Sequence, residues 1–430
     1  MGRSGRERVY GSRRLSGGRT TSRRLDAVEE AFRGLPARYL GAEEGFDATF
    51  HVRLADVGHT WEVRLTSHGA RVRKGVTRRE PDVTIGTDAD TWMRMRDGEV
   101  SGIDAFSARD LYARGNLDLA VAFEGFFRRP NGMDPLLRLA DVPVGRMKIS
   151  TLSMGQGHDV LLLHGLGATK ASFLDTASHL SRRYRVHVLD LPGFGSSSKP
   201  ATAPYNAKWF AQTVLGAMDE LGIGRAHLVG NSMGGRVALE LGISHPDRVS
   251  ALGLLCPAVA FVKREFHHVV RVLRPELGLL PHRFKRDTVA RRFWSLFADP
   301  DLVDPSVADI AMDEFQRIYG SAGARYAFLA SARNLYLDAP FGKRGFYPRL
   351  AELDAPSLFV WSSHDRLIPA GFERQVAEWL PRAEQIVLDT CGHAPQIERP
   401  EQTNGLLARF FAQVDALGGH AARRHVAAAA

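Results

Sequence analysis

The sequence has few cysteines and no long hydrophobic segment. Only Cys256 and Cys391 occur among 430 residues, which is too few for a disulfide framework, so nothing requires an oxidising compartment. The longest strongly apolar run, Ala251–Val262, is about a dozen residues long and too short to cross a bilayer as a helix. The N-terminal region also lacks the apolar segment of a secretory signal. We therefore expect a cytoplasmic protein.

Most of the chain also lacks net charge. The formal charge is +9, from 57 Lys and Arg against 48 Asp and Glu, but residues 1–24 alone carry eight Arg and one Glu. Arg423 and Arg424 account for the remainder, so residues 25–420 are electrically balanced. With no recognisable nucleic-acid module in this balanced region, we expect no nucleic-acid partner.

The two ends are predicted to lie outside the folded domains. Residues 1–24 are predicted to form a basic disordered tail, although an Arg- and Ser-rich, acid-poor segment is also typical of a transit peptide. Residues 418–430 are predicted to form an Ala-rich, unstructured tail. If charge has a role, we expect the basic tail, or the basic part of the insertion described below, to make a peripheral contact with an anionic membrane.

Residues 25–135 are typical of a small α+β domain. A helical pattern at the start gives way to period-two alternation in Phe50, Val52 and Leu54, and again in Trp61–Leu65. Further short strand and helix patterns follow, which predicts an antiparallel sheet backed by helices. Residues 128–142, rich in Pro, Gly and Asp, are predicted to form a linker.

From residue 145 the chain alternates between short apolar strands and amphipathic helices. This alternation predicts an α/β domain with a mostly parallel sheet covered on both faces, in which functional residues gather at the carboxyl ends of the strands. The predicted strands are Val160–Leu163, Arg185–Leu189, Ala226–Val229, Ala251–Leu255, Leu358–Trp361 and Gln385–Leu388.

A long interval interrupts this alternation and predicts a helical lid insertion at about residues 259–347. Its first part, residues 259–300, holds nine Lys and Arg against four Asp and Glu. A helical apolar face is formed there by Phe266, Val269, Val270 and Leu273. That face either contacts lipid and covers an acyl pocket, or packs on the core with its basic side in water.

Ser232 is the predicted nucleophile. It lies in Gly230-Asn231-Ser232-Met233-Gly234-Gly235, directly after a predicted strand and before a helix. A turn this sharp places a serine in a strained backbone, and only small flanking residues permit it. An ordinary glycine-rich turn is the alternative interpretation of the motif taken alone.

Two backbone N–H groups are predicted to form an oxyanion hole. His164-Gly165-Leu166-Gly167 closes the strand Val160–Leu163, and Met233 begins the helix after the nucleophile. The expected donors to a developing oxyanion are the N–H groups of Leu166 and Met233.

Asp365 and His393 complete the predicted catalytic set. Asp365 follows the strand Leu358–Trp361, and His393 follows the strand Gln385–Leu388 in a loop before a final helix. Other acids are worse placed: Asp354 lies at the wrong end of its strand, Asp190 is expected to shape a turn, and Asp338 lies within the insertion. Cys391, two residues from His393, is predicted to be a small buried residue and not a reactive thiol.

Over about residues 145–417 the sequence resembles the α/β-hydrolase fold family. The resemblance rests on His164–Gly167, Asp190–Gly193, Gly230–Gly235, Asp365 and His393, in the chain order serine, acid, histidine. The serine nucleophile argues against the haloalkane dehalogenase and epoxide hydrolase branches. The resemblance implies hydrolysis of an acyl bond, most often an ester, without a metal or organic cofactor.

Over about residues 28–130 the sequence resembles the sterol-carrier-protein lipid-binding domain. The resemblance rests on the two alternating strands, on Pro81–Ile85, on the segment from Trp92 to Gly98, and on Leu111–Leu119. It implies an open sheet and helices that enclose an apolar tunnel for lipid. A small accessory domain with an ordinary core is the alternative.

We therefore expect a serine hydrolase that cleaves a hydrophobic acyl ester, with the first domain binding or presenting lipid. The alternative outside the enzymes is a lipid carrier with a non-catalytic hydrolase-like module. Such a module would not require Ser232, Asp365 and His393 together. Among enzymes, a carbon–carbon bond hydrolase or a thioesterase uses the same triad.

Overall fold

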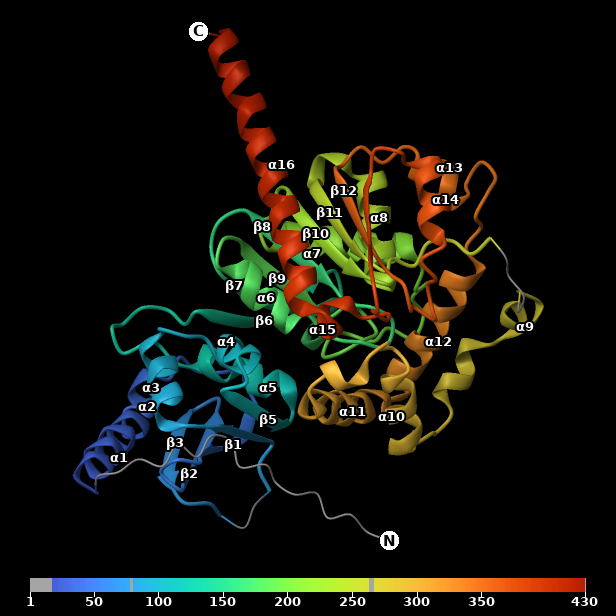
Figure 1. The fold of residues 1–430 in the computed structure, drawn as a ribbon. Coiled ribbons are helices and arrows are strands. Elements are labelled where there is room, and N and C mark those ends of the chain that lie inside the picture. Colours follow the sequence, from blue (N-terminus) through green and yellow to red (C-terminus); the bar gives the residue numbers. More distant parts are fainter. Residues whose placement is uncertain (1–17, 78–79, 263–266, 430) are drawn as a thin grey trace. The chain divides into compact units, whose positions relative to one another are not determined.

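The computed structural model describes residues 18–77, 80–262 and 267–429. The chain divides into two compact units, Met1–Arg138 and Leu139–Ala430. Each unit contains one β-sheet, as the labelled strands in Figure 1 show. The predicted basic tail lies mostly in residues 1–17, outside the described residues.

The first unit is built on a five-stranded sheet in the order β3-β2-β1-β4-β5. β1 pairs antiparallel with β2 and parallel with β4. The strands are β1 (Asp47–Leu54), β2 (His59–Thr66), β3 (Gly69–Lys74), β4 (Val83–Thr87) and β5 (Leu111–Gly115). The helices are α1 (Gly18–Arg33), α2 (Leu35–Arg38), α3 (Ala89–Asp97), α4 (Gly102–Ser107), α5 (Leu117–Ala122) and the 3-10 helix η1 (Phe123–Phe126).

The helices of the first unit cover the apolar face of its sheet. Phe32 of α1 stacks on Trp61 of β2 and on Trp92 of α3, with ring centroids 4.4 Å and 4.6 Å apart. The predicted alternation on β1 is confirmed, since its core-facing side chains are fully buried. These side chains are Phe50, Val52 and Leu54.

Helix α1 begins at Gly18, so the last seven residues of the predicted disordered tail, residues 18–24, are helical. Arg24 pairs with Asp56 at 3.2 Å and with Asp90 at 2.6 Å. The tail prediction is therefore wrong for residues 18–24, because carboxylates distant in sequence give this basic segment partners that its local composition does not reveal.

The second unit contains an eight-stranded sheet in the order β13-β12-β11-β10-β8-β9-β7-β6. β8 to β13 are parallel to one another, and β7 is antiparallel to β9. The six predicted strands are confirmed, and their carboxyl ends meet at one edge of the sheet. The strands are β6 (Leu137–Val144), β7 (Met147–Met154), β8 (Asp159–Leu163), β9 (Arg185–Leu189), β10 (Ala226–Asn231), β11 (Val249–Leu255), β12 (Ser357–Ser362) and β13 (Glu384–Leu388).

Strand β6 occupies the second half of the predicted linker, residues 128–142. Pro143 lies within it and argues against a strand in the sequence alone. β6 is the last strand at its edge of the sheet, however, and edge strands are where sheets tolerate proline. The linker prediction is wrong for this half.

Helices cover both faces of the second sheet: α6 packs against α16, and α7 packs against α8 (Figure 1). They are η2 (Lys170–Phe173), α6 (Leu174–Ser181), α7 (Ala207–Glu220), α8 (Met233–Ser244), η3 (Pro246–Arg248), α14 (Phe372–Trp379), α15 (Pro395–Glu398) and α16 (Pro400–Ala429). The prediction of an unstructured tail at residues 418–430 is wrong for residues 418–429, which belong to α16. Alanine has the highest helix propensity, so this Ala-rich end extends a helix that packing has already nucleated. No described helix has the length and apolar character needed to cross a membrane.

The insertion between β11 and β12 is helical, as predicted. It consists of α9 (His267–Val272), η4 (Pro275–Leu279), α10 (Arg286–Trp294), η5 (Pro300–Leu302), α11 (Pro305–Tyr319), α12 (Ala322–Leu337) and α13 (Phe346–Leu350). Of the predicted apolar face, Phe266 lies outside the described residues and Val269 is 65% exposed. Val270 and Leu273 are half-buried, so the described part of this face is packed only in part.

Candidate active site

Ser232 occupies a strained turn between β10 and α8. Its φ is +52°, a left-handed conformation that costs a side-chain-bearing residue free energy. The neighbouring glycines permit the turn, since a Cβ on Gly234 would lie 2.0 Å from the Leu163 carbonyl oxygen. The Ser232 N–H donates to the Leu255 carbonyl at 3.0 Å and the Ser232 carbonyl accepts from the Ala258 N–H at 2.9 Å, so the surrounding backbone holds the strain.

His393 and Asp365 form a buried hydrogen-bonded pair. The His393 Nδ1 and Asp365 Oδ2 atoms are 2.7 Å apart. The other carboxylate oxygen, Oδ1, accepts from the N–H groups of Leu367 at 2.8 Å and Ile368 at 2.9 Å. These two backbone donors fix the orientation of the carboxylate toward the imidazole.

The loop that carries His393 is tied to the Ser232 turn. Asn231, next to Ser232, donates from Nδ2 to the carbonyls of Leu255 and His393, each at 3.1 Å. On its other side, the His393 N–H donates to the Leu296 carbonyl of the insertion at 2.6 Å. The structure therefore brings together the carboxyl ends of β10, β12 and β13, from which Ser232, Asp365 and His393 follow.

The two predicted oxyanion donors flank the Ser232 turn. Met233 is the first residue of α8, where helix geometry leaves backbone N–H groups without a partner in the helix. On the facing loop, a Cβ on Gly165 would lie 3.3 Å from the Ser232 Cβ, so the residue before Leu166 lies directly against the turn.

His164 holds this facing loop in place. Its Nε2 accepts from the Leu191 N–H at 2.9 Å, so its proton is on Nδ1, which donates to the Gly165 carbonyl at 2.8 Å. Burial lowers the pKa of His164 and keeps the ring neutral. The sequence identified His164 only as part of a motif; its tautomer and positioning role depend on Leu191, a distant residue.

Glu398 is a site residue that sequence reasoning missed. Its Oε1 accepts from the N–H groups of Ala298 at 2.9 Å and Asp299 at 2.7 Å in the insertion, and its Oε2 accepts from Gly392 at 2.7 Å. It therefore joins the insertion to the His393 loop. An acid in a short helix is ordinarily a solvated residue, so the sequence carries no signal of this role.

The acids judged less suitable from the sequence have structural partners instead. Asp190 accepts from the Lys170 ammonium at 2.6 Å and the Ser196 N–H at 2.9 Å, which is a turn-shaping arrangement. Asp338 pairs with Arg236 of α8, and the exposed Asp354 pairs with Arg382 at 3.3 Å.

Both cysteines are buried. Burial raises the pKa of the Cys391 thiol to about 11, so it stays protonated near neutral pH, in agreement with the predicted structural role. Burial also raises the pKa of Cys256, whose Sγ donates to the Ser362 Oγ at 3.3 Å.

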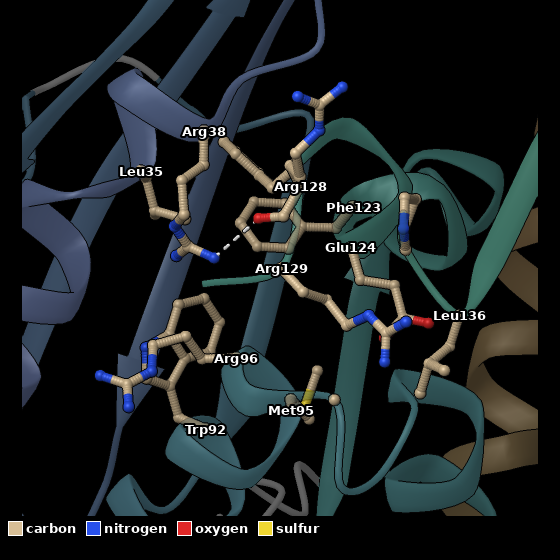
Figure 2. A pocket seen from close by; sticks show the side chains of 13 residues that line it. Leu35, Arg38, Trp92, Met95, Arg96, Phe123, Glu124, Arg128, Arg129 and Leu136 are labelled. Carbon is tan, nitrogen blue, oxygen red and sulfur yellow. Dashed lines mark hydrogen bonds between the residues drawn. The ribbon is translucent and has the colours of Figure 1, made fainter. Parts of the chain in front are cut away.

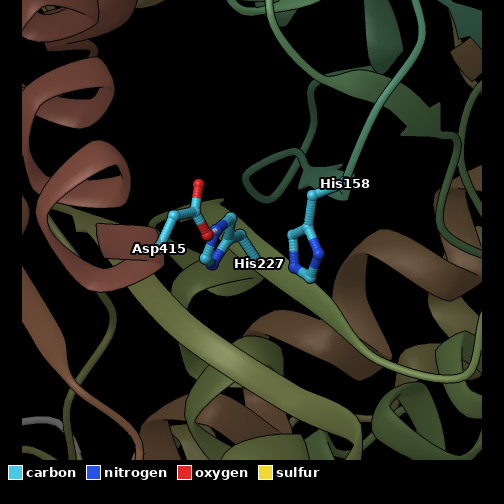
Figure 3. A group of neighbouring side chains, drawn as sticks. All are labelled: His158, His227 and Asp415. Atoms are coloured by element: carbon cyan, nitrogen blue, oxygen red, sulfur yellow. Dashed lines mark hydrogen bonds and ion pairs between the residues drawn. The ribbon is translucent and has the colours of Figure 1, made fainter. Parts of the chain in front are cut away.

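Among the residues that the structure describes, two groups of side chains could hold a metal ion by donor type. One is Cys256 with Asp365 and His393, and the other is His158, His227 and Asp415, shown in Figure 3. In the second group His227 bonds Asp415 at 3.0 Å, and Asp415 also accepts from the Tyr184 hydroxyl at 3.0 Å. These contacts form a hydrogen-bonded network that joins α16 to the amino end of β10. Ser232 follows the other end of that strand.

Two families match the chain. Residues 160–406 match the Alpha/beta hydrolase family, and residues 31–128 match the SCP-2 sterol transfer family. The two matches lie within the second and first units respectively.

The second unit is similar to hydrolases of several kinds. The chain is 30% identical over 269 residues to a pimeloyl-[acyl-carrier protein] methyl ester esterase of Aeromonas hydrophila, covering 61% of this chain and 99% of the relative. It is 30% identical over 267 residues to a 2-hydroxymuconate semialdehyde hydrolase of a Pseudomonas species, covering 61% and 89%. Among solved structures, a membrane phospholipase A described as a bacterial virulence factor matches with a TM-score of 0.55 and 28% identity, covering 65% of this chain and 87% of that one.

Proposed function

Because this chain belongs to the alpha/beta hydrolase family and carries an SCP-2 lipid-binding module before the hydrolase domain, we propose that it is a serine hydrolase of hydrophobic acyl esters. Ser232 would be the nucleophile, His393 the general base and acid, and Asp365 the residue that orients His393. The observation that carries this proposal is the strained Ser232 turn at the end of β10, tied through Asn231 to the loop of the 2.7 Å His393–Asp365 pair.

The proposed reaction proceeds through an acyl-enzyme. His393 Nε2 takes the proton of the Ser232 hydroxyl as its oxygen bonds to the ester carbonyl carbon. The Leu166 and Met233 N–H groups stabilise the oxyanion, and each such donor is typically worth about 3–4 kcal/mol of barrier. His393 then protonates the departing alcohol, after which it deprotonates a water that attacks the acyl-enzyme. The carboxylic acid leaves and Ser232 regains its proton, while Asp365 stays ionised throughout.

A hydrophobic substrate is supported by the SCP-2 module and by the esterase and phospholipase among the similar proteins. We expect kcat/KM on p-nitrophenyl esters to rise about tenfold or more from the acetate to the octanoate, since each buried methylene contributes about 0.8 kcal/mol. The measurement is the initial rate of nitrophenol release across the acyl series.

The ester series also separates the alternatives. A carbon–carbon bond hydrolase is the second candidate, favoured by the similarity to 2-hydroxymuconate semialdehyde hydrolase. Labelling of Ser232 by a fluorophosphonate without hydrolysis of any ester would favour that candidate or a thioesterase. Neither labelling nor hydrolysis, together with tight binding of fatty acyl ligands, would favour a lipid carrier with a silent hydrolase module.

We further propose that Val262 and residues 267–280 of the insertion contact an anionic membrane. This segment contains Arg271 and Arg274 and is anchored by Arg325, which donates to the carbonyls of Gly278 and Leu280, each at 2.9 Å. Exposed apolar side chains beside basic residues are typical of surfaces that enter a lipid interface. The exposed apolar residues are Val262, Val269, Val272, Leu277, Leu279 and Leu280.

The double variant Val269→Asp/Val272→Asp is expected to bind anionic phosphatidylglycerol vesicles at least about tenfold more weakly, because it removes apolar contact and adds repulsive charge. Both side chains are mostly exposed, at 65% and 74%, so the fold should tolerate the change. Co-sedimentation measures the binding, which should also fall with added salt.

Leu302→Asp is the matched control, since Leu302 is 45% exposed in the same insertion but lies outside the proposed membrane segment. Hydrolysis of soluble p-nitrophenyl acetate should be unchanged in both variants. Equal vesicle binding by the double variant and the control would contradict the proposed membrane surface.

A further inference from the structure

Several buried polar atoms lack a hydrogen-bond partner among the described residues. In the first unit, Trp92 Nε1 and Glu124 Oε1 are two of them, and both side chains line the pocket drawn in Figure 2. In the second unit, the Tyr319 hydroxyl is another, on a side chain that is only 2% exposed. An unpaired buried polar atom destabilises a fold, so each such atom is a place where a bound molecule can supply the missing partner.

Tyr319 is the last residue of α11, and its hydroxyl lies beside the loop that follows β8. A Cβ on Gly167 would lie 3.9 Å from the Tyr319 Oη and 3.1 Å from a ring carbon of Phe328 on α12. Gly167 directly follows Leu166, whose N–H is a proposed oxyanion donor. The insertion therefore covers the oxyanion loop with aromatic side chains, one of which carries an unpaired hydroxyl.

The described surroundings of the Tyr319 ring are aromatic and offer its hydroxyl no acceptor. Three phenylalanine rings surround it, with centroid distances between 4.2 Å and 6.4 Å. These rings belong to Phe284, Phe315 and Phe328. An apolar chain that enters beside Gly167 would therefore meet rings and a single polar atom.

The Tyr319 hydroxyl is available as a donor. Burial, and then the negative charge of Asp190, raise the pKa of Tyr319, so the hydroxyl stays protonated near neutral pH. The Asp190 carboxylate is not its hydrogen-bond partner, because its two oxygens accept instead from Lys170 and Ser196. A protonated hydroxyl in this position can be paired only by an acceptor that arrives with a ligand or with water.

We propose that Tyr319 determines specificity at the site of Ser232, by donating a hydrogen bond to an oxygen atom in the acyl chain of the substrate. The substrate class is then hydrophobic acyl esters that carry an ether or keto oxygen near the scissile carbonyl. This inference rests on the function proposed for Ser232, because an acyl chain lies beside Gly167 when its carbonyl is held by the neighbouring Leu166 N–H.

The hydroxyl separates two kinds of acyl chain. A plain hydrocarbon chain leaves it unpaired in the complex, whereas a chain with an oxygen at the right position pairs it. A site with a buried donor therefore rejects the analogue that lacks the acceptor. The surrounding rings contact both chains alike, so Tyr319→Phe, which keeps the ring and removes only the hydroxyl, isolates this effect.

The test measures binding by isothermal titration calorimetry in the full chain with Ser232→Ala, so that esters are not cleaved. The probes are methyl octanoate and three analogues in which an ether oxygen replaces the third, fifth or seventh atom of the acyl chain. Adding Tyr319→Phe is expected to weaken at least one analogue by about fivefold, the size of one net hydrogen bond. Methyl octanoate should bind equally to both chains.

Tyr347→Phe is the matched control. Tyr347 is a buried tyrosine of the same insertion, but its hydroxyl donates to the Ala260 carbonyl at 2.9 Å. Its replacement should lower the Tm, because the Ala260 carbonyl loses its partner, and should leave the order of affinities among the probes unchanged. Tyr319→Phe should not lower the Tm, since it removes a hydroxyl that has no partner in the fold.

The proposal is overturned if Tyr319→Phe weakens no analogue, if it weakens methyl octanoate as much as the analogues, or if no analogue binds. A fall in Tm as large as that of Tyr347→Phe would also overturn it, because the hydroxyl would then serve the fold. Failure of the proposed esterase activity would appear separately, as no hydrolysis of p-nitrophenyl octanoate by the unsubstituted chain, whereas the binding comparison needs no turnover.

Discussion

Replacement of Ser232 by alanine is expected to reduce ester hydrolysis by about a million-fold and to abolish labelling by a fluorophosphonate. Alanine removes the only oxygen that the proposed reaction acylates, and loss of a triad serine typically has an effect of this size. The backbone N–H and carbonyl of residue 232 would keep their bonds to Leu255 and Ala258, so the turn should persist. Turnover of p-nitrophenyl octanoate and circular dichroism measure the two outcomes.

Ser244→Ala is the matched control, because Ser244 ends the helix that Met233 begins and its hydroxyl bonds only locally, to the Glu240 carbonyl and to His245. It should keep full activity and labelling. Undiminished turnover in Ser232→Ala would exclude Ser232 as the nucleophile.

Asp365→Asn is expected to lower kcat by about ten-thousand-fold with little change in KM, the effect typical of a triad that holds the wrong histidine tautomer. Oδ1 of residue 365 must remain an acceptor, since the N–H groups of Leu367 and Ile368 donate to it. The asparagine NH₂ group would then face His393 Nδ1, where Oδ2 now lies at 2.7 Å. A donor at that position moves the imidazole proton to Nε2, so His393 could no longer accept the Ser232 proton.

Asp354→Asn serves as the control for this substitution. Asp354 precedes the same strand, β12, at its other end, and its side chain is 82% exposed. Stopped-flow or steady-state rates should show no loss in this variant beyond about twofold, as expected for an exposed ion pair. A similar loss in both variants, or none in Asp365→Asn, would mean that another acid orients His393.

The parallel sheet and the order of the proposed triad could be predicted because both depend on local sequence patterns. Continuous apolar runs marked β8 to β13, and strand ends in a parallel sheet meet at one edge, so Ser232, Asp365 and His393 could be assigned to that edge before any contact was known. The first unit could be recognised in the same way, from the alternation on β1 and β2.

Strand β6, the start of α1 and the end of α16 could not be predicted correctly, because each depends on context. Pro143 is acceptable only because β6 is an edge strand, and the basic start of α1 is held by Asp56 and Asp90. The Ala-rich end continues a helix that is packed against α6 and the sheet. Local composition cannot show which partners a segment will meet.

The sequence by itself determined the fold class, the two-unit organisation and the residue types of the candidate site, since strand period, turn chemistry and motif spacing are local properties of a chain. Only the tertiary structure decided how those residues are held: the +52° φ of Ser232, the two N–H groups that orient Asp365, and the Glu398 carboxylate that joins the insertion to the His393 loop. Each of these features joins residues distant in sequence, and their separation in space is set by packing and not by any periodicity that the chain displays.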